Sequence, residues 1–264
     1  MRNMYNYVEV KSMFAYYLTV ICGAVFLSIF LYFRVKKDLY KAVFFKAVTS
    51  FLFIACAFCA MRSFLPRAYS YIPYLTPHAA LIILGLLCGL FGDLWLDLKN
   101  MHPEAKDTYQ FFGMGSFLAS HIFFIPAMYL MSETLSGLFV PERWYQKGIW
   151  QMLIGFGFGL LFAIGVMVFE KPMKVHYGKY KLITFFYSFT IGASTGFSTA
   201  VFFGSGFETA PMFLMIGMAL VLISDIILSG TYFGEGKDRP VDIISNHALY
   251  YIGQFFVASS LLFA

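Results

Sequence analysis

Two carboxylates inside an apolar run are the residues of this chain most able to do chemistry. Asp93 and Asp97 lie in the run from Gly85 to Lys99, which otherwise has the composition of a membrane-spanning helix. A carboxylate in the hydrocarbon layer costs at least about 2.5 kcal/mol, so it faces a protein interior or a watered cavity and marks a functional site by default. Their spacing of four places both acids on one helical face, about 6 Å apart along the axis.

A third acid and an imidazole are expected near the same depth. Counted along the predicted helices, Asp93 lies about 9 Å and Asp225 about 12 Å from one membrane surface, and His121 lies about 18 Å from it. Paired carboxyl groups beside an imidazole are suited to general acid–base catalysis. The alternatives are that Asp225 only bonds a neighbouring helix and that His121 is a hydrogen-bonded packing residue.

A polar stripe on the last predicted helix reaches this layer. Asn246, Tyr250 and Gln254 follow one another at a spacing of four, so they share a face. We expect these three side chains and Asp97 to bind substrate, by holding water or a headgroup. Asp97 is also close enough to the membrane surface to be a solvated residue at a helix end.

Metal and nucleophile motifs are not found in the sequence. His121, His247, Asp93 and Asp225 are residue types that bind zinc, but no H-E-x-x-H or paired-cysteine spacing accompanies them. A G-x-S-x-G motif is also missing. The sequence therefore predicts no metal and no cofactor, and it favours carboxylate chemistry.

The composition is that of an integral membrane protein. Of 264 residues, 60% are hydrophobic and only 12% are charged, far from the balance of a soluble domain. The net charge of +5 is spread over short loops, which suits contact with lipid headgroups rather than nucleic acid. The partners that this predicts are the lipid bilayer and no nucleic acid.

Apolar runs long enough for about 30 Å of hydrocarbon predict eight helices. We therefore expect an all-α, polytopic membrane protein, in which residues 1–264 form a single bundle of eight transmembrane helices. The predicted spans are 12–33, 42–61, 78–98, 109–131, 149–169, 182–203, 211–233 and 247–263.

Loop charges predict the orientation. The loops after the first, third, fifth and seventh spans hold about twice as many Lys and Arg residues as the other side, so we expect these loops in the cytoplasm and both termini outside. The membrane would be the plasma (inner) membrane of a bacterium or the endoplasmic reticulum of a eukaryote. Lys46, five residues into the second span, is expected to snorkel to the cytoplasmic surface.

Three G-x-x-x-G spacings predict close helix packing. They are formed by Gly85 and Gly89, by Gly155 and Gly159, and by Gly192 and Gly196. The last pair could instead break its helix, as in transporters.

Four short motifs, in this order, resemble those of one family. They are Gly92-Asp93-Leu-Trp-Leu, Phe112-Gly113 with Phe117 and Ala119-Ser-His121-Ile-Phe, Ser224-Asp225 with Leu228, and Tyr250-Tyr251-Ile-Gly-Gln254. Together they resemble the YhhN-like family of eight-helix membrane proteins, which includes the lysoplasmalogenases.

The resemblance implies hydrolysis of the vinyl-ether bond of a lysoplasmalogen, a lysophospholipid, to a fatty aldehyde and a glycerophospho-ethanolamine or -choline. This reaction needs a proton donor and a second carboxylate, as glycosidases do. We expect Asp93 and Asp225 to be this pair, with His121 orienting groups or exchanging protons, and all three beside Gln254 in one cavity. The alternatives are a small-molecule or lipid transporter and a metal-dependent membrane lipid hydrolase.

Overall fold

The computed structural model describes residues 2–68, 77–138, 143–234 and 239–263. Within these ranges the chain is all-helical apart from connections, as predicted, and short 3-10 turns accompany the main helices. The eight helices are α1 (Arg2–Val35), α2 (Leu39–Ala68), α3 (Pro77–Met101), α4 (Lys106–Leu138), α5 (Gly148–Val168), α6 (Lys181–Gly204), α7 (Thr209–Phe233) and α8 (Pro240–Ser259).

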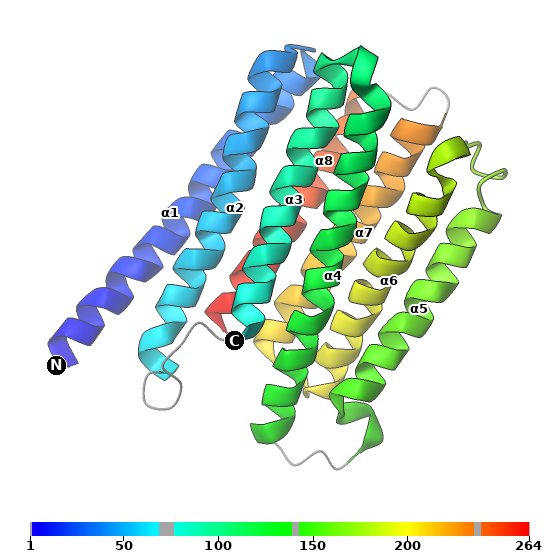
Figure 1. The fold of residues 1–264 in the computed structure, drawn as a ribbon. Helices are drawn as coiled ribbons and strands as arrows, with labels where there is room; N and C mark the ends of the chain where they lie inside the picture. The colour runs from blue at the N-terminus through cyan, green and yellow to red at the C-terminus, as the bar shows by residue number, and fades with distance from the viewer. Residues whose placement is uncertain (1, 69–76, 139–142, 235–238, 264) are drawn as a thin grey trace.

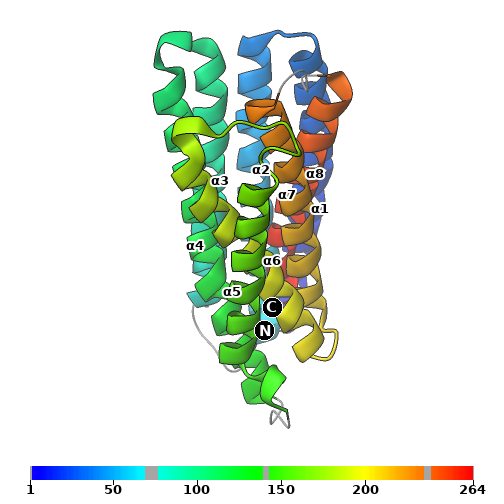
Figure 2. The same cartoon turned by 90° about the vertical axis from the view of Figure 1, so that its right-hand side faces the viewer.

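The helices run side by side in one bundle, and neighbours in the chain are antiparallel (Figure 1). The pairs α1–α2, α3–α4, α5–α6 and α7–α8 make the most extensive contacts. α6 also packs on α4 and α7, and α8 packs on α2, which joins the pairs into one body (Figure 2). Both chain ends lie toward the same end of the bundle, as an even number of spans requires.

Local sequence explains several helix ends. Pro77 and Pro240 each occupy the first position of a helix, where the missing N–H leaves no hydrogen bond unmade. α8 therefore begins seven residues before its predicted span at residue 247, and Asp242 lies in its first turn, where a negative charge suits the helix dipole. α6 is unbroken from Lys181 to Gly204, so its glycines do not interrupt it.

Six helices are long and apolar enough to cross a membrane on length and composition alone, within the described residues. α6 and α8 are not among them, although both run alongside the other six (Figure 1). Both carry many buried Ser, Thr, Tyr or amide side chains. A helix covered by its neighbours does not need an apolar surface on every side, so polar residues lower its hydropathy at little cost.

Glycines bring α5 and α6 into backbone contact, as the G-x-x-x-G spacing predicts. A Cβ atom at Gly159 would lie 2.5 Å from the carbonyl oxygen of Phe189, and one at Gly192 would lie 2.9 Å from the Cα atom of Gly159. One turn along, a Cβ at Gly196 would be 3.2 Å from the Cα of Gly155. This tight pairing leaves α5 beside α6 at the rim of the bundle (Figure 2).

Candidate active site

Asp93 is the centre of a buried hydrogen-bond network between α2, α3 and α8. Its Oδ2 accepts hydrogen bonds from the hydroxyls of Ser50 at 2.7 Å, Tyr250 at 3.1 Å and Tyr251 at 3.3 Å. The side chain is 3% exposed. Gly89, one turn before Asp93, makes room for this network, because its missing Cβ would lie 3.3 Å from the Tyr250 hydroxyl oxygen.

Lys46 supplies the positive charge of this network. Its Nζ lies 3.4 Å from Oδ1 of Asp93 and 3.5 Å from Oδ2 of Asp97, and the side chain is 4% exposed. The prediction that Lys46 snorkels to the membrane surface is therefore wrong. Two carboxylates lie closer than the surface does, and pairing a buried ammonium with them removes the reason to reach water.

Asp97 is held between two cations without a direct hydrogen bond. Arg34 Nη1 lies 3.6 Å from its Oδ1, whereas Lys46 pairs with its Oδ2. Neither carboxylate oxygen of Asp97 has a hydrogen-bond partner among the described residues, since both ion pairs exceed the usual hydrogen-bond length. Asp97 is only 1% exposed. The alternative that it is a solvated residue at a helix end is therefore wrong.

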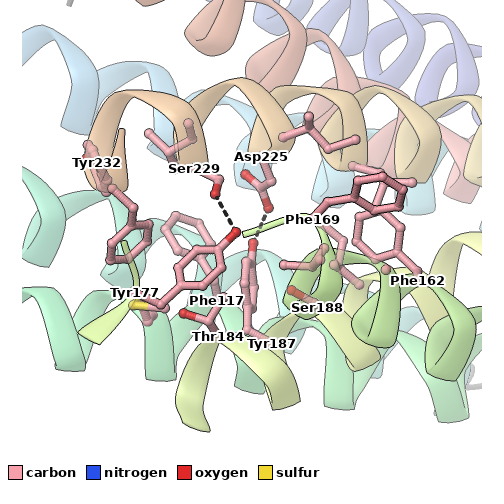
Figure 3. A pocket seen from close by; sticks show the side chains of 18 of the residues that line it. Phe117, Phe162, Phe169, Tyr177, Thr184, Tyr187, Ser188, Asp225, Ser229 and Tyr232 are labelled. Atoms are coloured by element: carbon pink, nitrogen blue, oxygen red, sulfur yellow. Dashed lines mark hydrogen bonds between the residues drawn. The ribbon is translucent and has the colours of Figure 1, made fainter. Parts of the chain in front are cut away.

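Asp225 lies in a different setting, in the wall of a cavity of about 390 Å³. Its carboxylate accepts a hydrogen bond from the hydroxyl of Tyr187 on α6 (Figure 3). No cation lies within 4 Å of this carboxylate among the described residues. It is also the only carboxyl group among the described residues that line the cavity.

The cavity is largely apolar and lies in one half of the bundle. Its walls are the C-terminal halves of α5 and α7 and the N-terminal halves of α4 and α6, so it lies toward the α5–α6 connection. Hydroxyl groups of several side chains reach its lining (Figure 3). These side chains are Tyr177, Thr184, Tyr187, Ser188, Ser229 and Tyr232.

A connecting segment closes one end of the cavity. Met173 and Tyr177, between α5 and α6, belong to its lining. The segment is fixed to the end of α7, because His176 N donates to the Phe233 carbonyl at 2.7 Å and the Tyr177 hydroxyl lies 3.2 Å from Ser229 Oγ.

The cavity borders the outer surface of the bundle at α5 and α7. Three of its lining residues also belong to the outer surface, since Leu161 is 71%, Phe169 55% and Ile226 42% exposed. In a membrane this surface faces lipid, so the cavity lies next to the bilayer here.

His121 lies next to the Asp225 site. Its Nδ1 is 2.8 Å from Ser194 Oγ on α6. Its ring packs edge-on against that of Tyr187, with 6.0 Å between the centroids. His121 therefore touches the side chain that holds Asp225, and it does not line the cavity described above.

Asp93 and Asp225 occupy two adjoining sites and not the single cavity that we expected. As far as the chain is described, the lining of this cavity includes Asp225 but not Asp93, His121 or Gln254. The wall between the sites is aromatic, because Phe117 lines the cavity and packs edge-on against Tyr250, the donor to Asp93.

The two remaining predicted residues lie on α8. Asn246 Nδ2 donates to the carbonyl of Ser224 at 2.8 Å, and Ser224 Oγ donates to the Asn246 carbonyl at 3.0 Å, which clamps α8 to α7. Gln254 is 2% exposed, and its Oε1 has no hydrogen-bond partner within the described part of the chain. Their role in substrate binding stays a prediction.

Several residues of these sites were not predicted from the sequence. Ser50 follows Lys46 at a spacing of four, and this shared helix face was a usable signal. Tyr187 and Arg34 gave no such signal, because a tyrosine or a terminal arginine is common in any membrane helix. No group of three His, Cys, Asp or Glu side chains that could hold a metal ion is found among the described residues.

Comparison with known proteins places the chain in one family. No curated protein and no solved structure matches it. The sequence profile of the YhhN family matches residues 41–261, which is most of the chain and includes Lys46, Asp93, His121 and Asp225. The chain is therefore a multi-pass membrane protein that belongs to the YhhN family.

Proposed function

We propose that this protein is a membrane-embedded hydrolase that cleaves the vinyl-ether bond of lysoplasmalogens. The observation that carries the proposal is the position of Asp225, the single carboxyl group among the described residues that line an apolar cavity, some of whose lining residues also lie on the outer surface. A cavity of this size lies within the range of small-ligand sites. Family membership supports the same substrate class through the resemblance to lysoplasmalogenases.

The reaction is R–CH=CH–O–R′ + H₂O → R–CH₂–CHO + HO–R′. Asp225 starts as the acid form, because its site has a hydroxyl partner but no cation among the described residues. It gives its proton to the alkene carbon farther from oxygen, which leaves an oxocarbenium ion. Water then adds to the carbon next to oxygen and returns a proton to Asp225, and the hemiacetal breaks into aldehyde and alcohol.

Asp93 and Lys46 would serve this reaction from the adjoining site. The Lys46 ammonium and three hydroxyl donors offset part of the cost of burying a charge on Asp93. A negative charge held there would act on a cation formed beside Asp225. His121 is a positioning residue in this scheme, since it packs on Tyr187 and fixes the hydroxyl that holds Asp225. Glycosidases also use two carboxyl groups, of which one is neutral and the other is ionised.

The test is release of fatty aldehyde from lysoplasmalogen by the purified protein. We expect Asp225→Asn to lower the catalytic rate by about 10² or more, the scale of a general acid. Asp38→Asn is the matched control, because Asp38 precedes α2 and is not part of the cavity lining, and Asn also caps helices well. An Asp225→Asn protein as active as wild type would refute the proposal. The same assay with a metal chelator tests the metal-dependent alternative, which predicts that aldehyde release is lost.

A lipid transporter or binding protein is the second candidate. It is favoured by the buried ion pairs across α1, α2 and α3, since charged groups inside a membrane bundle also occur along transport pathways. The same assay separates the two functions. A transporter would move or bind the lysophospholipid without releasing aldehyde.

A further inference from the structure

Lys99 is a buried cation that the proposed reaction does not use. It lies in the last turn of α3 and is 7% exposed. Its Nζ is 3.1 Å from the centre of the Tyr232 ring and 3.5 Å from Gln110 Oε1. Within the described residues, no carboxylate lies within 4 Å of this ammonium group, in contrast to Lys46 and Arg34.

The electrostatic surroundings of Lys99 favour an anion. Lys46, Arg34 and Lys106 all act on its ammonium group as like charges, and Asp97 opposes them. Asp97 is already paired with Lys46 and Arg34, so it offers Lys99 little compensation. A buried ammonium group without an anionic partner is costly, and a bound anion would remove that cost.

Tyr232 places this cation at the cavity. Its ring lies against Lys99 and also lines the cavity that contains Asp225. Tyr232 follows Asp225 by seven residues on α7, which is about 10 Å along the helix toward the loop end. An extended glycerol unit with its ester oxygen covers a distance of the same order.

We propose that Lys99 binds the phosphate group of a lysophospholipid whose hydrocarbon chain occupies the cavity. This inference rests on the proposed function for the substrate class. The phosphate takes the place of the Tyr232 ring as the partner of Lys99, which exchanges a cation–π contact for a charge-assisted hydrogen bond. Lys99 thereby selects phosphate-bearing lipids over neutral ones and sets the position of the vinyl ether beside Asp225.

Binding can be tested without catalysis. The full-length protein in detergent is titrated with a 1-O-alkyl glycerophosphoethanolamine, which has no vinyl ether to cleave, and with the matching 1-O-alkylglycerol, which has no phosphate. Ligand-induced thermal stabilisation gives the affinities. We expect wild type to bind the phospholipid about tenfold or more tightly than the alkylglycerol, the scale of a hydrogen bond to a charged group.

Lys99→Gln should lose this preference and bind both lipids equally. Lys106→Gln is the matched control, because it removes the same charge from an exposed residue at the same end of the bundle and should keep the preference. A Lys99→Gln protein that still prefers the phospholipid would overturn the proposal. Equal binding of both lipids by wild type would overturn it as well, whether or not the variant folds.

A third ligand distinguishes the source of the phosphate. Water-soluble glycerophosphoethanolamine should bind weakly on its own, because it lacks the chain that fills the cavity. If glycerophosphoethanolamine binds tightly and the binding depends on Lys99, then the preferred ligand of this subsite is the released product and not the lipid. If the phospholipid binds through Lys99 but lysoplasmalogen yields no aldehyde, the hydrolysis is refuted and the subsite stands.

Discussion

At the scale of single residues, the two carboxylates differ in what surrounds them. Asp93 has an ammonium group and three hydroxyl donors, whereas Asp225 has one tyrosine hydroxyl in an apolar cavity. The ammonium group and the hydroxyl donors offset part of the cost of burying a charge on Asp93, whereas Asp225 has no cation within 4 Å among the described residues. The environment can therefore divide acid and electrostatic roles between two identical side chains, as it does in lysozyme.

Asp93→Asn tests the electrostatic role. The variant keeps the shape of the side chain and removes its charge, so aldehyde release should fall by about 10² while the protein still folds. Initial rates at saturating lysoplasmalogen would show the loss, and size-exclusion chromatography in detergent would confirm folding. Full activity of the purified variant would contradict a role for the charge.

Substitutions of Lys46 and Asp93 should have coupled effects on the thermal stability of the protein. Lys46→Met leaves a buried carboxylate unpaired, and breaking a buried pair in this way costs about 3–5 kcal/mol in soluble proteins. The double variant Lys46→Met/Asp93→Asn keeps the Arg34–Asp97 pair and should recover most of the lost thermal stability, though not activity. Additive effects of the two substitutions on the unfolding temperature would argue against the pair.

At the scale of helices, α5 contains glycines in two different surroundings. Gly155 and Gly159 lie against the backbone of α6, where a Cβ would collide. At Gly157 and Gly165 a Cβ would meet nothing within 4 Å. Of these two, Gly165 lines the cavity, so it keeps open the space in which we place the lipid chain.

Gly165→Phe should therefore block the cavity. The ring has room to enter it, and the substitution also removes a helix-weakening glycine, so we expect the fold to persist. The KM for a long-chain lysoplasmalogen should rise at least about tenfold, because the ring displaces a few methylene groups of the lipid chain and their burial no longer contributes to the binding free energy. Gly157→Phe makes the same change on the exposed face of α5 and should leave the KM unaltered. Equal kinetics for both variants would place the chain elsewhere.

At the scale of the whole molecule, the cavity lies in one half of the bundle, toward the loops that carry most of the Lys and Arg residues. The positive-inside rule places these loops in the cytoplasm. The lipid site would then open to the cytoplasmic leaflet, and the termini would lie on the opposite side.

The orientation can be measured with a single cysteine introduced by Phe263→Cys next to the C-terminus, after replacement of the four native cysteines. We expect a membrane-impermeant thiol reagent to label it from outside intact cells. Control labelling of Lys36→Cys, in the α1–α2 connection, should require permeabilised membranes. The reverse pattern would place the site in the other leaflet.

The sequence by itself determined the helices, their membrane character and the depth of the polar groups. Length and apolar composition are sufficient for this, because a bilayer permits few other structures. Counting residues along the predicted helices placed Asp93 and Asp225 in the same half of the bundle. The G-x-x-x-G spacing also predicted correctly that α5 and α6 pack closely, although it did not say that they pack against each other.

Only the tertiary structure decided which polar groups meet. Depth follows from counting residues along a helix, but contacts depend on how each helix is rotated and which helices are its neighbours. The sequence left both quantities open, so Lys46 was expected in water and is found between Asp93 and Asp97. For the same reason, the sequence did not show that Phe117 and Tyr250 form an aromatic wall, which divides the expected single cavity into two adjoining sites.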